Sequence, residues 1–353
     1  MREMKDSGVE WIGNIPKNWS ILKLKYVLKF SGSGTTPSSN KLEFYDGDIE
    51  WIQSGDLYHT NTIVNTKVKL KSLALKYCPA LKFYKAPFIV IAMYGASVGN
   101  ASISCINACT NQACCVLYPN NENNLKFLYY WIVIAKNELL KKSIGGGQPN
   151  INQITIKNLN FINLPYKNQQ AIADFLDAKC ADIDSLTEDI QKQIDILKEY
   201  KKSVITQAVT KGIAPNVEMK DSGIAWIGLI PESWRIFRLK YLLAKPLQYG
   251  ASETGIEFTK DLPRYIRITD IDENNHLKES GKLSLSFEKA KPYILKDNCV
   301  LFARSGATVG KTFFYKRSYG LAAFAGYLIA AFTKSTLLCA NWLYYYTQSN
   351  TYW

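Results

Sequence analysis

The most regular hydrophobic pattern of the chain lies between residues 167 and 212. Apolar residues recur there at every seventh position, separated mostly by Asp, Glu, Lys and Gln. The repeating positions are Leu176, Ile183, Ile190, Leu197 and Val204. A sustained seven-residue apolar period predicts a coiled-coil helix, with these five side chains facing a partner helix or subunit. Roughly 44 residues at about 1.5 Å each make a helix about 66 Å long.

A stripe of this length is too long to be buried in one small domain. We therefore expect a second helix to pair with it. A single amphipathic helix lying on a globular core is the alternative, and the pattern leaves it open.

The sequences on the two sides of this predicted helix repeat each other. Residues 4–28 read MKDSGVEWIGNIPKNWSILKLKYVL, and residues 219–243 read MKDSGIAWIGLIPESWRIFRLKYLL. Weaker echoes follow, with 51–57 matching 265–271, 94–100 matching 305–311, and 128–130 matching 343–345. The spacing is far longer than a solenoid repeat, so it indicates a duplicated domain.

We predict an α+β protein with two similar mixed α/β domains joined by a long coiled-coil-type helix. The first domain is expected at 1–166, the spacer helix at 167–212 and the second domain at 213–353. Within the first copy, the pattern predicts strands at 49–53, 62–70, 88–93, 113–118 and 159–164. It also predicts a loop at 31–41 and a helix at 125–142 that Asn123 or Asn124 caps.

The charge balance favours a polyanionic partner. The chain carries 43 Lys and Arg against 30 Asp and Glu, a net charge of +13. Such an excess suits nucleic acid or an acidic membrane surface. No signal-peptide pattern opens the sequence, and the longest apolar run, 321–332, is too short to span a bilayer. We therefore expect a cytoplasmic protein without a membrane partner.

The chemistry of a catalyst or a metal site is missing from the sequence. The eight cysteines show no C-x-x-C spacing, so free thiols in a reducing cytoplasm are expected rather than zinc. Residues 305–312 resemble a phosphate loop, but only three residues separate Gly306 from Gly310, where that motif has four. Residues 163–166 resemble the Asn-Pro-Pro-Tyr box of adenine methyltransferases, with Leu164 replacing the first proline. The sequence thus predicts a binding protein without catalysis of its own and without a bound cofactor or metal.

Residues able to read DNA bases gather in the predicted loops. Asn, Gln, Arg, Ser, Thr and Asp side chains can donate or accept hydrogen bonds at base edges. The candidates in the first copy are Thr35, Thr36, Ser38, Asn40, Gln53, Asp56, Asn100, Asn111, Gln112 and Gln148. The candidates in the second copy are Gln248, Tyr249, Ser252, Arg264, Arg267, Thr269, Arg304, Thr308 and Lys311. Because the two copies differ at these positions, we expect each to read its own DNA sequence; solvated surface is the alternative for any one residue.

Several motifs together resemble one protein family. They are the twice-repeated Met-Lys-Asp-Ser-Gly-x-x-Trp-Ile-Gly-x-Ile-Pro-x-x-Trp, then 34–38 with 51–57, 147–152, and 169–176 at the start of the predicted helix. They cover nearly the whole chain, which resembles the specificity subunit of a type I restriction-modification system. The resemblance implies two target recognition domains that read the halves of a split double-stranded DNA site. It further implies helical regions that dock methyltransferase subunits, and restriction subunits in the full complex. S-adenosylmethionine, ATP and Mg would then be bound by those partners.

The C-terminal part departs from the family pattern. Family members carry a second long helix that pairs with the first, and here it is missing and the second recognition domain is incomplete. We therefore expect a truncated chain that is either inactive or relies on a helix from another specificity chain. Two other hypotheses stay open: a coiled-coil scaffold whose domains bind protein or polysaccharide, and a methyltransferase fragment.

Overall fold

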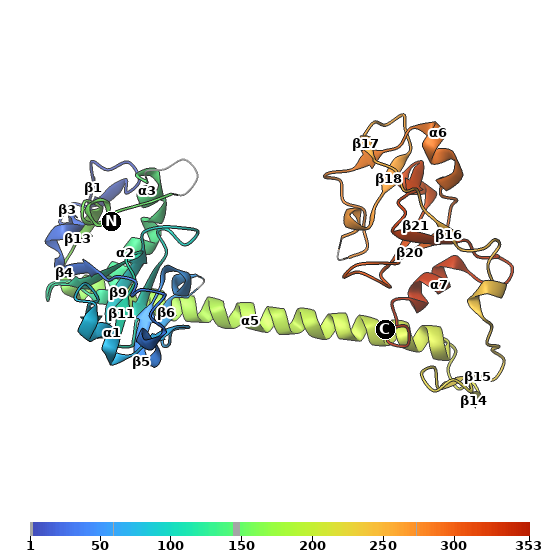
Figure 1. Ribbon diagram of the computed structural model, residues 1–353, viewed down its shortest axis with the longest axis horizontal. Helices are drawn as coiled ribbons and strands as arrows, with labels where there is room; N and C mark the ends of the chain where they lie inside the picture. The colour runs from blue at the N-terminus through green and yellow to red at the C-terminus, as the bar shows by residue number, and fades with distance from the viewer. Residues whose placement is uncertain (1–2, 59, 144–148, 273) are drawn as a thin grey trace. The chain divides into compact units, whose positions relative to one another are not determined.

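The computed structural model describes residues 3–58, 60–143, 149–272 and 274–353 (Figure 1). The chain falls into two compact units, Met1–Leu186 and Thr187–Trp353. The division lies inside the longest helix, so each unit contains a globular domain together with one part of that helix.

Unit 1 is built on two sheets. The five-stranded sheet contains, in spatial order, β4 (Leu28–Ser33), β12 (Cys114–Pro119), β9 (Phe88–Ala92), β10 (Ala101–Ser104) and β6 (Thr62–Ile63). The four-stranded sheet contains β7 (Lys69–Leu70), β5 (Tyr45–Ile52), β11 (Ala108–Thr110) and β8 (Phe83–Tyr84). Two pairs complete the unit: β1 (Met4–Asp6) with β2 (Asn14–Pro16), and β3 (Ser20–Lys23) with β13 (Asn160–Asn163). All five residues of β9 are buried, which places this strand at the centre of the core.

The helices of unit 1 are short. They are α1 (Ser72–Tyr77), α2 (Leu125–Ile134), α3 (Lys136–Lys141), α4 (Gln153–Lys157) and the 3₁₀ turns η1 (Leu24–Tyr26), η2 (Leu42–Phe44) and η3 (Ser54–Leu57). The side chain of Asn124 accepts a hydrogen bond from the Phe127 N–H (3.0 Å), so the predicted cap is confirmed. The predicted helix at 125–142 divides at Ala135 into α2 and α3.

Two sequence predictions for this unit are wrong in detail. The strand predicted at 62–70 is two short strands that belong to different sheets, because β6 pairs with β10 and β7 pairs with β5. The loop predicted at 31–41 begins three residues later, because residues 31–33 continue β4 and pair with β12. Their small side chains are those of a loop, and the neighbouring strand overrides that composition.

Unit 2 repeats this plan on a smaller scale. One sheet contains β16 (Gln248–Tyr249), β23 (Leu328–Ala331), β20 (Cys299–Ala303) and β21 (Thr312–Tyr315). The other contains β17 (Ile256–Glu257), β19 (Leu283–Ser284), β18 (Arg264–Ile266) and β22 (Ala322–Phe324), and β14 (Met219–Asp221) pairs with β15 (Leu229–Pro231). The helical elements are α6 (Phe287–Ala290), α7 (Ala340–Tyr346), η4 (Leu239–Tyr241), η5 (Ile268–Asp270), η6 (Lys291–Tyr293) and η7 (Arg317–Tyr319).

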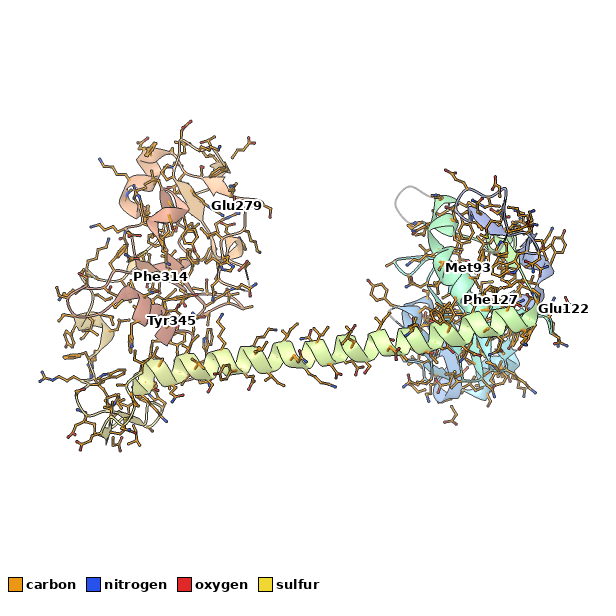
Figure 2. All side chains as sticks on the ribbon, turned by 180° about the vertical axis from the view of Figure 1, so that it is seen from behind. Met93, Glu122, Phe127, Glu279, Phe314 and Tyr345 are labelled. Carbon is orange, nitrogen blue, oxygen red and sulfur yellow. The ribbon has the colours of Figure 1, made fainter. Side chains whose placement is uncertain are left out.

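The predicted long helix is present as α5 (Tyr166–Lys211), 46 residues without a break. Its bounds lie one residue before the predicted ones at each end. Every residue from 181 to 201 is exposed, and Figure 2 shows their side chains projecting from the helix. Ion pairs three residues apart, such as Lys192 with Asp189 (3.4 Å), give modest support to an exposed helix.

The apolar stripe of α5 lies largely in the open. Leu176 is half-buried, whereas Ile183, Ile190, Leu197 and Val204 are exposed. Pairing of this stripe with another helix stays a prediction. Exposed apolar side chains at a constant period are nevertheless the feature that such pairing requires.

A buried glutamine attaches α5 to the domain of unit 1. Gln169 donates from Nε2 to the Leu164 carbonyl (2.9 Å) and to Asn123 Oδ1 (3.2 Å). Its Oε1 accepts the backbone N–H of Asn124 (2.8 Å). The amide therefore satisfies groups from the preceding strand end and from the cap of α2, and this fixes where α5 starts.

A second contact lies two turns further along α5. Asp177 accepts a hydrogen bond from the Tyr130 hydroxyl (2.7 Å) and forms an ion pair with Lys126. Burial raises the pKa of Asp177, but the hydrogen bonds from Lys126 and Tyr130 outweigh it and hold that pKa below its ordinary value. Burial raises the pKa of Tyr130 as well, and its bond to Asp177 adds to the rise.

Within the described part of the chain, no helix combines the length and apolar character needed to cross a membrane. All eight cysteines are free thiols. Cys105 and Cys339 are exposed, and burial raises the pKa of Cys109 and Cys299 to about 12.

Candidate nucleic-acid interface

The two units hold their loops with the same backbone hydrogen bonds. Asn111 N–H donates to the Ile52 carbonyl (3.0 Å) in unit 1, and Ala325 N–H donates to the Ile266 carbonyl (2.9 Å) in unit 2. Likewise, Met93 N–H donates to the Ala113 carbonyl (2.7 Å), and Arg304 N–H donates to the Tyr327 carbonyl (3.1 Å). These bonds define equivalent positions in the two units, so Gln112 corresponds to Gly326 and Met93 to Arg304.

An aspartate caps the same 3₁₀ turn in both units. Gln53 N–H donates to Asp56 Oδ2 (2.9 Å) before η3, and Arg267 N–H donates to Asp270 Oδ2 (2.8 Å) before η5. The Asp56 carboxylate, predicted as a base reader, is thus engaged in holding its own turn. The variable position is the residue before the turn, which is Gln53 in one unit and Arg267 in the other.

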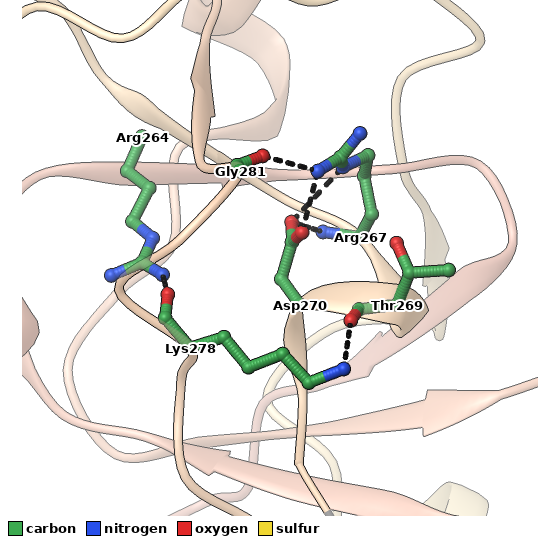
Figure 3. Close-up of polar contacts among 6 residues, drawn as sticks. All are labelled: Arg264, Arg267, Thr269, Asp270, Lys278 and Gly281. Carbon is green, nitrogen blue, oxygen red and sulfur yellow. Dashed lines mark hydrogen bonds and ion pairs between the residues drawn. The ribbon is translucent and has the colours of Figure 1, made fainter. Parts of the chain in front are cut away.

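Two predicted DNA-reading arginines of unit 2 are engaged inside the protein (Figure 3). Arg267 donates from Nε and Nη2 to the Asp270 carboxylate (3.1 and 2.6 Å) and from Nη2 to the Gly281 carbonyl (2.7 Å). The hydrogen bond to Asp270 raises the pKa of Arg267.

Arg264 is buried, and its Nη2 donates to the Lys278 carbonyl. Because a buried guanidinium needs fixed partners, this geometry favours a structural role for Arg264.

Three more candidates are tied to backbone carbonyls of their own unit. Asn100 donates to the Leu57 carbonyl (3.2 Å), and Lys311 at the equivalent turn donates to the Asp272 carbonyl (2.6 Å). Gln248 donates to the Pro292 carbonyl (2.7 Å) and accepts from Lys245 Nζ (2.7 Å). These side chains join loops to one another, and base contact is not favoured for them in this arrangement.

The remaining candidates of unit 1 form an exposed polar cluster. Thr36 Oγ1 donates to Gln112 Oε1 (2.6 Å), which joins the loop after β4 to the loop after β11. The Gln112 amide nitrogen makes no hydrogen bond with the described residues, so it can donate to a ligand. Ser38 and Asn40 are exposed nearby in sequence, and Thr35 and Asn111 are half-exposed.

A close backbone approach fixes this cluster in unit 1. A Cβ added at Gly34 would lie 1.7 Å from the Thr110 carbonyl oxygen, so only glycine fits there. Gly34 therefore brings the loop of Thr36 against the strand that precedes Gln112.

The exposed cluster of unit 2 is built around a cation and a ring. The Arg304 guanidinium lies 4.9 Å from the centroid of the exposed Tyr249 ring, and its Nε donates to the Gly326 carbonyl (2.9 Å). Ser252 lies beside Gly326. A guanidinium held over an aromatic ring retains donors for a phosphate or a guanine edge. Thr269 and Thr308 are also exposed.

Sequence reasoning missed one member of this cluster. Tyr327 is exposed, and its carbonyl accepts the Arg304 N–H, which places it beside the arginine. The only signal in the sequence was a tyrosine directly after Gly326, and it lies within the apolar run 321–332, which is typical of a core segment. Gln148, another candidate, lies outside the described residues.

Each unit thus carries a mixed α/β domain with a polar loop cluster at the same place on its scaffold, and a long helix runs through both units. This combination is typical of a protein that binds an extended ligand at two sites. The family model described as the type I restriction modification DNA specificity domain matches residues 16–195, about half of the chain. The chain belongs to this family, which supports a DNA-recognition role.

Individual relatives agree with this assignment. The chain is 26% identical over 313 residues to the MjaIX specificity subunit of Methanocaldococcus jannaschii, which covers 84% of this chain and 68% of that protein. It is 28% identical over 233 residues to the EcoBI specificity subunit of Escherichia coli, which covers 59% of this chain and 46% of that protein. The chain therefore spans between about half and two thirds of the length of these relatives.

Solved structures share the fold. The HsdS subunit from Thermoanaerobacter tengcongensis aligns with a TM-score of 0.51 at 16% identity, over 94% of this chain and 80% of that one. A chain from a structure of a type I restriction-modification system, solved to explain its complex assembly and conformational transition, aligns with a TM-score of 0.63 at 15% identity and the same coverage. The predicted family and fold class are confirmed.

Proposed function

We propose that the chain is the sequence-reading subunit of a type I restriction-modification complex and has no catalytic activity itself. Each unit would read one half of a bipartite double-stranded DNA target. The observation that carries this proposal is the pair of equivalent loop clusters. The same backbone bonds support Thr36 with Gln112 in unit 1 and Tyr249 with Arg304 in unit 2, so one scaffold presents two different sets of donors.

The exposed stripe of α5 would dock methyltransferase subunits or a helix from another specificity chain. Ile190, Leu197 and Val204 support this part because they expose apolar surface at helical spacing. S-adenosylmethionine, ATP and Mg would be bound by the methyltransferase and restriction subunits. The free thiols fit a reducing cytoplasm.

The test is to co-purify the chain with its methyltransferase subunit and map the methylated adenines. A Thr36→Val/Gln112→Ala double variant should relax one half of the methylated site and leave the other unchanged. A Tyr249→Ala/Arg304→Ala double variant should relax the other half only. Each lost base-edge contact should reduce discrimination by about 1–3 kcal/mol.

Ile256→Ala is a suitable control, because this exposed residue on β17 belongs to neither loop cluster. A site that changes in both halves after either double variant would contradict separate reading. DNA binding that is absent or independent of salt would instead favour a coiled-coil scaffold with another partner.

A further inference from the structure

A small pocket of unit 2 gathers three lysines. Lys240, Lys245 and Lys334 line a cavity of about 450 Å³, and its other lining residues are all apolar. Among the residues that the structure describes, no carboxylate forms an ion pair with any of these three ammonium groups. The lysine pocket therefore presents positive charge that the domain itself does not neutralise.

Each ammonium group is held in place but keeps donors for a ligand. Lys245 Nζ donates to Gln248 Oε1 (2.7 Å), and Lys334 Nζ donates to the Tyr241 carbonyl (3.5 Å). Lys240 Nζ lies 4.9 Å from the centroid of the Tyr241 ring. Because an ammonium group has three donors, each of the three lysines retains at least two for an anion.

The lysines of the pocket also repel one another's charge. Burial lowers the pKa of Lys245, and the neighbouring Lys296 adds to the decrease. A bound anion would relieve this repulsion, and the apolar lining would strengthen its attraction to the ammonium groups.

The same place in unit 1 lacks the charge of Lys334. The Asn120 N–H donates to the Val27 carbonyl (2.9 Å). In the same way, the Lys334 N–H donates to the Leu242 carbonyl (2.8 Å). Asn120 therefore holds the position of Lys334.

Unit 1 lacks the charge of Lys245 as well. Two residues before Asn120, Tyr118 packs against the Phe30 ring (6.2 Å between centroids). Two residues before Lys334, the Phe332 ring lies 3.9 Å from Lys245 Nζ. Phe30 thus occupies the place of Lys245, and Lys29 points to the opposite face of β4 because neighbouring strand residues alternate.

This surface stays exposed in unit 1 although α4 and β13 complete the core of that unit. Tyr26 is 64% exposed and Phe30 41%. Lys25 is exposed too, and its Nζ lies 4.9 Å from the Tyr26 ring centroid, as Lys240 lies from Tyr241. The lysine pocket is therefore formed on an open part of the shared scaffold.

A single segment connects the lysine pocket to the exposed cluster of unit 2. Lys245 precedes Tyr249 by four residues, which span at most about 14 Å. The hydrogen bond from Lys245 to Gln248 lies within this segment, and Tyr249 pairs with Ile329 on β23. One DNA strand rises about 3.4 Å per nucleotide, so the pocket lies within about four nucleotides of the cluster.

We propose that the lysine pocket binds backbone phosphates of duplex DNA beside the half-site that unit 2 reads, and that unit 1 has no equivalent anchor. This inference rests on the proposed DNA-reading function and adds an asymmetry to it. Phosphate contacts release counterions and carry no sequence information. Unit 2 therefore makes the larger contribution to salt-dependent affinity, while both units contribute to sequence discrimination.

The test gives the pocket of unit 2 the residues of unit 1. A Lys245→Phe/Lys334→Asn variant is co-purified with its methyltransferase subunits and titrated with duplexes that contain or lack the mapped site. The slope of log affinity against log salt should decrease by about two, since each phosphate contact contributes about 0.9. Both duplexes should bind more weakly by the same factor, about tenfold or more at low salt, so discrimination is unchanged.

Two exposed lysines provide a matched pair of single variants. Lys240→Asn should lower the salt slope by about one. Lys25→Asn removes a lysine with the same position over a tyrosine ring, and it should leave the slope unchanged.

Three outcomes would overturn this inference while DNA reading stands. They are an unchanged slope in the double variant, an equal decrease in Lys25→Asn and Lys240→Asn, and a loss of discrimination confined to one half-site. Saturable binding of ATP without DNA, lost in the double variant, would assign the pocket to a free nucleotide and also overturn it. Failure of the unaltered complex to bind DNA would instead overturn the proposed function, and this inference with it.

Discussion

The two units share the same hydrogen-bonded framework of loops but present different side chains at the surface. Both use an aspartate to cap the 3₁₀ turn that follows an inner strand of the four-stranded sheet, Asp56 after β5 and Asp270 after β18. Both tie the following glycine turn to a nearby carbonyl, through Asn100 or Lys311. The side chains that face outward differ, with an amide and a hydroxyl in unit 1 and a guanidinium over a ring in unit 2.

This difference separates two kinds of polar residue. A side chain that bonds to backbone of its own unit maintains the loop shape, whereas one with unused donors at the surface is available to a ligand. The comparison therefore narrows the DNA-reading candidates to the two exposed clusters. Substitutions in the shared framework and substitutions in the two exposed clusters test this division separately.

The largest effect is expected at the join between unit 1 and α5. Gln169→Leu leaves the Asn124 N–H and the Leu164 carbonyl without their partner and should destabilise unit 1 by about 3 kcal/mol. Unit 2 contacts its part of α5 through other residues, including buried Val209 and Thr210 and the bond of Thr206 to Asn350, so its own unfolding should not change. Denaturant unfolding followed by hydrogen exchange in each unit measures both.

The neighbouring glutamine is the control for this prediction. Gln170 accepts a hydrogen bond from the Asn124 side chain and donates one to Asp174, both in partly or fully exposed surroundings. Gln170→Leu should therefore lower the stability of unit 1 by less than about 1 kcal/mol. Equal losses in the two variants would contradict the role given to Gln169.

The capping aspartates give the next largest effect. Asp270→Ala should destabilise unit 2 by about 2 kcal/mol, because it removes the cap and leaves the half-buried Arg267 without its charged partner. Asp56→Ala removes only the cap and should lower the stability of unit 1 by about 1 kcal/mol. Thermal unfolding of both variants checks the difference.

A double-mutant cycle identifies the source of that difference. In an Arg267→Gln background, which copies Gln53, the Asp270→Ala loss should fall to the Asp56→Ala value. If the loss stays at its original size, the arginine is not the cause.

A smaller effect is expected from single changes in the exposed clusters, on the basis of the proposed function. Arg304→Ala should weaken DNA binding about tenfold and reduce the salt dependence by about one counterion. Gln112→Ala should weaken binding to a similar extent without changing the salt slope, because an amide carries no charge. Titrations at several salt concentrations distinguish the two; identical slopes for both variants would contradict the assigned contacts.

The smallest effect concerns pH. The folded pKa of Asp177 lies below its ordinary value of 3.8, so the ionised group stabilises unit 1 above that value. The contribution should be lost as pH falls from about 4 through the lower folded pKa. Since Asp177 is partly exposed, the change is small, and it should be absent in Asp177→Asn when denaturant midpoints are compared between pH 5 and 3.

The sequence predicts the long-period features of this molecule well. The seven-residue period locates α5 to within one residue, and the duplicated segments anticipate the matching sheets of the two units. The seven-residue period recurs over five positions, and the two copies of the duplicated segment agree at many positions, so single exceptions do not hide either signal. The family follows from the same repeated motifs.

The surroundings of the candidate site residues depend on contacts between distant residues, which the sequence does not show. In the sequence, Gln248 is a possible hydrogen-bond donor to DNA from a loop. In the structure it donates to the Pro292 carbonyl, 44 residues away. Arg264 lies in a polar context in the sequence, yet β18 runs through the core and buries it. Composition shows which side chains can bind a base, whereas only the folded chain shows which of them still have donors to offer.

Each unit contains one exposed thiol that a reagent can label selectively. Cys105 belongs to unit 1 and Cys339 to unit 2, whereas the buried thiols, such as Cys109 and Cys299, have pKa values too high for rapid alkylation at neutral pH. A maleimide reagent should therefore modify Cys105 and Cys339 first, so one fluorophore can be placed on each unit without changing the sequence.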